Sequence, residues 1–323
     1  LFTTNINKNT NFLLAFKALR SLGKYQNSLS GSKHFRFGFS FIRNNLDSKI
    51  FFSSQKLEKH ENGGLNDTSL IDFESGNPEF KERSKLNVNF EDAVNTYQTR
   101  NFYFINNYTL LNKNKNYISI IYNLDYETTN NKYEQEQASY LYGSLRSGLT
   151  EVNDHYKFRS LKNVIKLKTK SSFFDELTLG YTNYNYNFFE INQSDEKIAG
   201  ENSSLFSGSV LKKIGDIKIN FDISQKIKGD RVGNKINFNL KSNHKTKFNY
   251  LINLNLNQSH PGLIYDIYNS DYSNTNFERK NKLIETKSLN IKLNKKSIGK
   301  ASFSYLNVTN QFYLTVNADV QNK

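Results

Sequence analysis

The segment His34–Arg43, HFRFGFSFIR, alternates strictly between two kinds of side chain. Every odd-numbered position from Phe35 to Phe41 is phenylalanine, and arginine, glycine and serine occupy the positions between them. Successive side chains of a β-strand point to opposite faces, so this segment would present one aromatic face and one polar face. The fold therefore has to supply an apolar environment on one side of this strand and a polar one on the other.

The same two-residue period recurs along the chain. It is clear in YISIIYNLDY (Tyr117–Tyr126), DIKINFDIS (Asp216–Ser224) and KFNYLINLNLN (Lys247–Asn257). Such alternation predicts half-buried strands and argues against helices. About fourteen strands are predicted in this way, at Asn11–Arg20, His34–Arg43, Ser48–Lys56, Asn101–Leu111, Tyr117–Tyr126, Ser160–Thr169, Asp175–Phe188, Leu205–Lys212, Asp216–Lys226, Lys235–Lys241, Thr246–Asn257, Lys282–Leu293, Ile298–Asn307 and Gln311–Val320.

The links between the predicted strands alternate in length, with the exception of Val308–Asn310, which is short where a long link is expected. Brief turns are expected at Asn44–Asp47, Asn112–Asn116, Lys170–Phe174, Lys213–Gly215, Ser242–Lys245 and Asn294–Ser297. Long links are expected at Ser21–Ser32, Leu57–Arg100, Glu127–Arg159, Phe189–Ser204 and Gln258–Asn281. Tight turns on one rim and long loops on the other are typical of bacterial outer-membrane barrels.

An all-β, antiparallel transmembrane β-barrel is therefore the predicted fold class, with the phenylalanines facing lipid and Arg36 and Ser40 facing an aqueous lumen. The barrel has to close because unpaired backbone groups in hydrocarbon cost several kcal/mol each. The alternative is a soluble β-sandwich or solenoid, in which the same phenylalanine face would form the core. The number of strands, their length of about ten residues and the one-sided long loops favour the barrel.

Composition excludes several other classes of protein. The chain has no cysteine, so disulfides and thiolate sites are impossible, and its apolar runs, such as FLLAF at Phe12–Phe16, are far shorter than the roughly 20 residues of a membrane helix. The formal net charge of +14 favours anionic partners. The chain starts at Leu1 and contains no methionine, which predicts an internal part of a longer precursor with its signal upstream.

Several segments resemble a known family. They are AFKALRSLGKYQ (Ala15–Gln26), ENGGL (Glu61–Leu65), DFESGNPEF (Asp72–Phe80), LNVNFEDA (Leu86–Ala93), YTNYNYNF (Tyr181–Phe188) and HPGLIYDIYNSDYSNTNF (His260–Phe277). In this order along most of the chain, they resemble the putative porin family of Bacteroidetes outer membranes. One departure is the absence of tryptophan, which the family commonly places near the segment that ends at Phe277.

The resemblance implies a β-barrel in a bacterial outer membrane, with a precursor that is longer at both ends. Residues 1–323 would then form a single β-barrel domain that is incomplete at both ends. Within it, residues 57–100 would be a long extracellular loop, for which folding into the barrel mouth is one option. The family supplies no catalytic residues to carry over.

Basic side chains on the polar faces of the predicted strands are the candidate pore-lining residues. They are Lys17, Arg36, Lys162, Lys166, Lys168, Lys218, Lys235, Lys241 and Lys292. In a water-filled lumen, a ring of cations favours anions over cations. The alternative is that these lysines merely occupy solvated positions.

Other chemistry is not expected. The histidines form no spaced ligand pair, so no metal is predicted; they are His34, His60, His155, His244 and His260. The carboxylates between Glu58 and Asp92 lack the spacing of a calcium loop, and Gly63 and Gly64 precede no phosphate-binding lysine. With no assembled acid, base or nucleophile, we expect neither enzymatic activity nor a cofactor.

Two functions remain open from the sequence. The first is a porin-like barrel for passive diffusion of small solutes, with anionic solutes as a candidate class. The second is a plugged structural or interaction barrel that pairs with another cell-envelope protein. Expected partners are outer-membrane lipids, lipopolysaccharide and small solutes. Nucleic acid is not expected, because lysines and aromatic rings fall on opposite faces of each strand and would not contact phosphates and bases together.

Overall fold

A single antiparallel sheet of fourteen strands dominates the structure. It is a computed structural model that describes residues 1–113, 116–191, 195–242, 248–272, 277–278, 282–295, 297–314 and 320–322. The sheet strands are β1 (Phe2–Asn7), β2 (Thr10–Ser21), β3 (Ser30–Arg43), β4 (Leu46–Glu61), β5 (Ala93–Lys113), β6 (Asn116–Gln135), β7 (Val152–Lys170), β8 (Glu176–Ile191), β9 (Asp195–Ile214), β10 (Ile217–Lys228), β11 (Val232–Ser242), β12 (Phe248–Ser259), β15 (Ile284–Lys295) and β16 (Gly299–Thr309).

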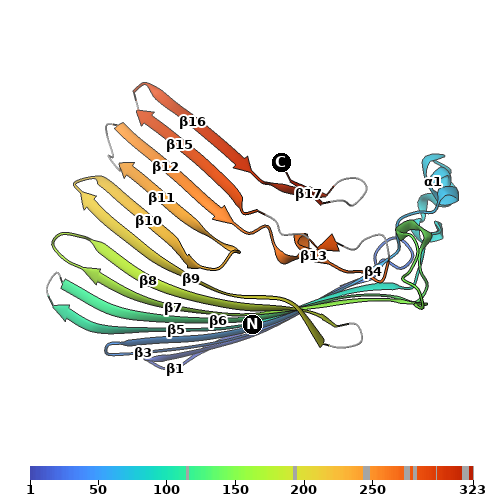
Figure 1. Cartoon of the computed structure of the whole chain (residues 1–323), viewed down its shortest axis with the longest axis horizontal. Coiled ribbons are helices and arrows are strands. Elements are labelled where there is room, and N and C mark those ends of the chain that lie inside the picture. Colours follow the sequence, from blue (N-terminus) through green and yellow to red (C-terminus); the bar gives the residue numbers. More distant parts are fainter. Residues whose placement is uncertain are drawn as a thin grey trace.

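Each strand of this sheet pairs with the next one along the chain, in the order β1 to β12 and then β15 and β16. Figure 1 shows the sheet curling around a concave face, on which β13 (Ile267–Tyr268) and β17 (Phe312–Leu314) lie. An up-and-down antiparallel meander with this curvature is the architecture of a β-barrel wall. The predicted fold class is confirmed.

Thirteen of the expected strands correspond to strands of the sheet, and two differences remain. In the expected strand Gln311–Val320, the described residues do not join the sheet, because β17 pairs with β18 (Val320–Asn322) and not with β16. This explains why Val308–Asn310 did not fit the alternation of link lengths. Conversely, β1 is a strand of the sheet that the sequence pattern did not predict, because its sequence, FTTNIN, contains too few apolar residues to show a two-residue period.

The strands are longer than the sequence pattern indicates. β5, β6, β7 and β9 have 21, 20, 19 and 20 residues, whereas about 9–11 suffice to cross a bilayer. The expected link Glu127–Arg159 is therefore reduced to residues 136–151, and β8 and β9 take up nearly all of Phe189–Ser204. The extensions escaped prediction because both faces are polar there, as in ETTNNKYEQ (Glu127–Gln135), so no period is visible.

The link between β4 and β5 spans residues 62–92, within the expected 57–100. It carries helix α1 (Asp67–Glu74), whose N-cap Asn66 accepts a hydrogen bond from the Ser69 backbone N–H (2.9 Å), and two 3₁₀ turns. Figure 1 places α1 beyond the ends of the strands. None of the described helices is long and apolar enough to cross a membrane.

Pairing fixes which side chains share a face, because residues directly opposite each other point the same way. Phe37 lies opposite Leu14 of β2 and Phe52 of β4, and its ring meets that of Phe12 edge-on at 5.4 Å. This convex face remains apolar around the sheet and open to its surroundings: Ile165 on β7 is 54% exposed and Phe303 on β16 is 57% exposed. Such a surface suits contact with lipid.

Candidate functional site

Residues 260–272, which we call the mouth segment, leave β12 and cross the concave face of the sheet (Figure 1). The segment contains the 3₁₀ turn η4 (Leu263–Tyr265) and β13. It bonds to β6, β7 and β8, although β9, β10 and β11 lie between those strands and β12 in the sheet. Residues 260–272 thus cross the concave face, while the folding of residues 57–100 into the barrel mouth stays a prediction.

Asp154 is the first anchor of the mouth segment. The residue is 5% exposed, and its carboxylate accepts hydrogen bonds from the Ser270 hydroxyl (2.6 Å) and the Asp271 backbone N–H (2.8 Å). In return, the Asp271 carboxylate accepts a bond from the Asn153 backbone N–H (2.8 Å). Hydrogen bonds to charged groups are stronger than neutral ones, so this exchange ties the segment firmly to β7.

Tyr156 is the second anchor. Its hydroxyl accepts a hydrogen bond from the Asn269 backbone N–H (2.8 Å) and donates to the carbonyl of the same residue. Its ring stacks against Phe188 at 5.5 Å and Tyr268 at 5.7 Å, while the Asn269 amide donates to Glu190 (2.9 Å). Aromatic packing and polar bonds thus reinforce each other at this point.

Tyr272 forms the third anchor and joins the mouth segment to the link 136–151. The Tyr272 hydroxyl donates to Gln135 (2.9 Å) and accepts from the Ser139 backbone N–H (2.9 Å). Leu145 and Tyr272 form a β-bridge, and Tyr272 is only 3% exposed. The mouth segment and the link 136–151, which lie on the same rim of the barrel, therefore stabilise each other.

Replacing Asp154 by alanine is expected to weaken docking of the mouth segment by about 1–3 kcal/mol, because the Asp271 N–H would lose its acceptor in a buried place. Hydrogen exchange at residues 267–272 should then accelerate roughly ten-fold or more. The control is Asn153→Ala, since Asn153 contacts the segment through its backbone. Equal exchange in both variants would contradict the anchoring role of Asp154.

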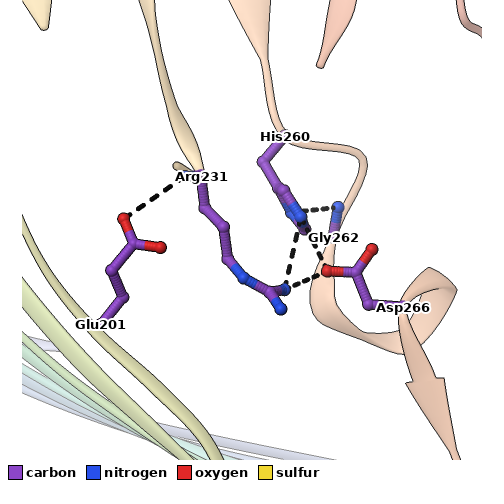
Figure 2. Close-up of polar contacts among 5 residues, drawn as sticks. All are labelled: Glu201, Arg231, His260, Gly262 and Asp266. Atoms are coloured by element: carbon purple, nitrogen blue, oxygen red, sulfur yellow. Dashed lines mark hydrogen bonds and ion pairs between the residues drawn. The ribbon is translucent and has the colours of Figure 1, made fainter. Parts of the chain in front are cut away.

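Figure 2 shows an ion-paired cluster where the mouth segment begins. Arg231, in the link between β10 and β11, pairs with Asp266, and its backbone N–H donates to Glu201 on β9 (3.3 Å). The Gly262 N–H donates to His260 Nδ1 (3.0 Å), which leaves the proton of the neutral ring on Nε2, from where it bonds Asp266 (2.9 Å). Gly262 has a φ of +117°, a conformation that other residues rarely adopt.

Burial lowers the pKa of the His260 imidazole below its usual value, and the attraction of the nearby Asp266 carboxylate only partly offsets this effect. His260 therefore binds a proton less readily when the mouth segment is docked on the concave face than when the segment is undocked and His260 is exposed to water. Below the ordinary histidine pKa of about 6.5, acidification favours the undocked state, because protonation of Nδ1 removes the acceptor of the Gly262 N–H.

We expect hydrogen exchange of residues 262–272, corrected for its intrinsic pH dependence, to speed up several-fold as the pH falls from neutral to about 5. A His260→Gln variant should lose this additional acceleration, because glutamine does not titrate. Acceleration of the same size in the variant and the wild-type protein would show that another group is responsible.

The register places all nine candidate basic residues on the concave face. Lys162 lies on the face of β7 that carries Asp154. Arg36 lies on the same face of the sheet, because successive pairs of opposite residues lead from Arg36 through Ser53, Asn101 and Glu127 to Ser160, which shares the face of Lys162 on β7. The others follow from the same pairings; they are Lys17, Lys166, Lys168, Lys218, Lys235, Lys241 and Lys292. Their role in lining a pore stays a prediction.

The nine candidate basic residues differ in the charges that surround them. Lys168 forms an ion pair with Glu176 (2.8 Å), and Lys162 lies opposite Asp125. Three other candidates, Lys218, Lys241 and Lys292, lie near the short turns as Lys168 does, on the rim that corresponds to the periplasmic side of a barrel.

Lys213, which we did not single out from the sequence, extends that group. Lys213 lies opposite Lys218, Lys218 lies opposite Lys241, and Leu251 lies between Lys241 and Lys292. We call these four lysines the periplasmic lysine row. All four are exposed, and none forms an ion pair with a carboxylate of the described residues. Lys213 could have been found from its place next to the turn.

The histidines remain apart from one another. His34 lies on β3, His60 on β4 and His155 on β7, while His244 lies outside the described residues. In the part of the chain that the structure describes, no three metal-binding side chains gather into a possible site. His260 is the one histidine with a place in the mouth segment.

Comparison of the sequence with family models identifies the family of the chain. A family model described as "Putative porin" matches residues 1–322. The chain belongs to this porin family. It is accordingly a β-barrel protein of the bacterial outer membrane, as expected from the sequence. No curated protein matches the sequence of this porin-family chain.

Solved structures support the fold. The ferric enterobactin receptor PfeA of Pseudomonas aeruginosa matches with a TM-score of 0.61 at 11% identity, over 96% of this chain and 50% of the receptor. The ferric-catecholate import receptor Fiu of E. coli K12 matches with a TM-score of 0.59 at 8% identity, over 99% and 57%. The siderophore receptor PirA of Acinetobacter baumannii matches with 0.58 at 12%, over 98% and 52%. The porin-family chain thus spans about half the length of these receptors, and the likeness concerns the fold alone.

The mouth segment did have a signal in the sequence. It lies within HPGLIYDIYNSDYSNTNF, one of the stretches that carried the family resemblance. Its aspartates and tyrosines, with Asn269 and Ser270, form the anchors. Most of their partners lie more than a hundred residues earlier in the chain, so the sequence alone did not bring them together.

Proposed function

We propose that this porin-family protein lets small solutes diffuse passively across the outer membrane and prefers anions. The observation that carries the proposal is the periplasmic lysine row. Like charges directly opposite each other destabilise a sheet, and these side chains are exposed on the concave face without carboxylate partners among the described residues. A solute anion in the lumen would relieve this repulsion.

Single-channel recording tests the proposal. The full-length protein is inserted into a planar lipid bilayer with different potassium chloride concentrations on the two sides, and the reversal potential is measured. Steady openings with a reversal potential near the chloride equilibrium value are the expected result. A steady current with no anion preference would contradict the role of the lysine row.

The second candidate is a barrel whose mouth is closed until a cell-envelope partner displaces the mouth segment. The three buried anchors favour it, because they tie residues 260–272 to strands on the opposite side of the mouth. Under this proposal the wild-type protein carries no current, and a variant without the mouth segment does. Equal currents in both proteins would exclude a closed mouth.

A further inference from the structure

A cavity of about 500 Å³ lies between the mouth segment and the concave face of β5 to β8. Five aromatic rings contribute to its wall, although the interior of a membrane barrel is ordinarily polar. The residues that matter most for the argument are Tyr97, Phe158, Tyr184, Tyr186, Glu127 and Arg231. Apolar walls with a few polar groups are typical of binding sites for small molecules.

Tyr186 supplies an independent indication of a ligand. The residue is 3% exposed, yet its hydroxyl has no hydrogen-bond partner among the described residues. The same tyrosine also lines a neighbouring cavity of about 940 Å³, with Glu201, Arg231 and Asp266. A buried hydroxyl without a partner is costly, and Tyr186 lines both cavities, so a hydrogen bond with an occupant would satisfy this hydroxyl.

The rings form a continuous surface. Phe158 stacks with Tyr186 at 5.9 Å, and Tyr184 and Tyr186 lie 5.8 Å apart. Tyr97, on β5, is 40% exposed and adds a ring at the edge of the cavity. Such a surface suits a flat molecule that presents C–H groups to the ring faces.

The charges of the cavity wall oppose an ionic occupant. Glu127 is an acceptor with a negative charge and Arg231 a donor with a positive charge, so a cation would meet Arg231 and an anion would meet Glu127. A neutral molecule with several hydroxyl groups can instead donate to Glu127 and accept from Arg231 and the Tyr186 hydroxyl. Sugar rings combine such hydroxyl groups with apolar C–H faces.

We infer that the cavity beneath the mouth segment is a binding site for a neutral carbohydrate. The site lies at the end of the barrel opposite to the periplasmic lysine row, so a sugar would bind there before it enters the lumen. This inference goes beyond the proposed diffusion function, because binding at the mouth requires no conducting pore.

The test measures equilibrium binding to the full-length protein in lipid nanodiscs, which avoids detergents with sugar headgroups. The probes are maltohexaose, cellohexaose and xylohexaose, with tetraethylammonium and inorganic phosphate as charged comparators, and saturation-transfer NMR and calorimetry report binding. At least one hexasaccharide should bind more tightly than either ion. The inference is overturned if no hexasaccharide binds or if an ion binds more tightly.

A pair of tyrosine variants on one strand assigns the binding to this cavity. Tyr186→Phe keeps the ring and removes only the hydroxyl, and it should weaken binding by roughly two- to ten-fold without loss of thermal stability. Tyr181→Phe changes the opposite, convex face of β8 and should leave affinity unchanged. If Tyr186→Phe binds like the wild-type protein, the hydroxyl does not serve a sugar.

Binding and conductance separate this inference from the proposed function. A protein that binds a hexasaccharide but carries no current would contradict passive diffusion and support the sugar site. A conducting, anion-preferring pore that binds no hexasaccharide would contradict the sugar site and support diffusion.

Discussion

Removal of residues 260–283 is expected to raise the single-channel conductance of the full-length protein by roughly two-fold or more, because it clears the mouth of the pore. Ser259 and Ile284 are directly paired at the ends of β12 and β15, so an Asn-Gly turn can join them as a hairpin. The fourteen strands of the sheet remain intact, and the barrel should still fold. Conductance is measured in planar bilayers and compared with that of the wild-type protein.

The matched control removes the other large link of the same rim. Glu61 and Ala93 are likewise paired, so the same Asn-Gly turn can replace residues 62–92, including α1. Because α1 lies beyond the strand ends (Figure 1), this larger deletion should leave the conductance close to the wild-type value. If the two deletions act alike, residues 260–272 do not restrict the pore.

Reversal of charge in the periplasmic lysine row should change the sign of the ion preference. In the triple variant Lys218→Glu, Lys241→Glu and Lys292→Glu, β10, β11 and β15 would present carboxylates to the lumen where the wild-type protein presents ammonium groups. The reversal potential in a salt gradient should move from the anion side to the cation side. High salt should reduce the shift, since it screens exposed charges.

The control has the same change in net charge on the convex face. Lys33, Lys157 and Lys287 point away from the lumen by the pairing register, and their replacement by glutamate should leave the reversal potential almost unchanged. An equal shift in the control would mean that overall charge, and not the lysine row, sets the preference.

Reversal of Lys162, Lys166 and Lys168 is expected to have a smaller effect. Lys168 is already paired with Glu176, and Lys162 lies opposite Asp125, so the local charge of this region is closer to neutral. The sequence placed these lysines on the polar face, but it contained no information on which lysines have a carboxylate beside them. That distinction depends on pairing between strands.

The period-two pattern predicted the strands only where they meet lipid. The phenylalanines of β3 and the isoleucines of β10 were assigned to the correct face, because lipid on one side and water on the other impose different residue types on alternate positions. The pattern disappears in Glu127–Gln135, where β6 continues with polar residues on both faces. Strand ends outside the membrane were therefore invisible.

The candidate site was harder to predict than the wall. Asp154 and Tyr156 occupy ordinary positions of an alternating strand, and nothing near them in the sequence indicates that Ser270 and Asn269 will cover them. The Tyr186 hydroxyl is equally inconspicuous within YTNYNYNF. These features arise from contacts across the lumen, which depend on the curvature of the whole sheet.

The mouth segment also has a consequence for the order of assembly. Strand pairs in the sheet form between neighbours in the chain, whereas Asn269 meets Tyr156 across 113 residues and Tyr272 meets Gln135 across 137. Loop closure over such distances is slow compared with the zipping of adjacent hairpins. We expect each new barrel to pass through a stage in which its wall is complete through β12 and its mouth still stands open.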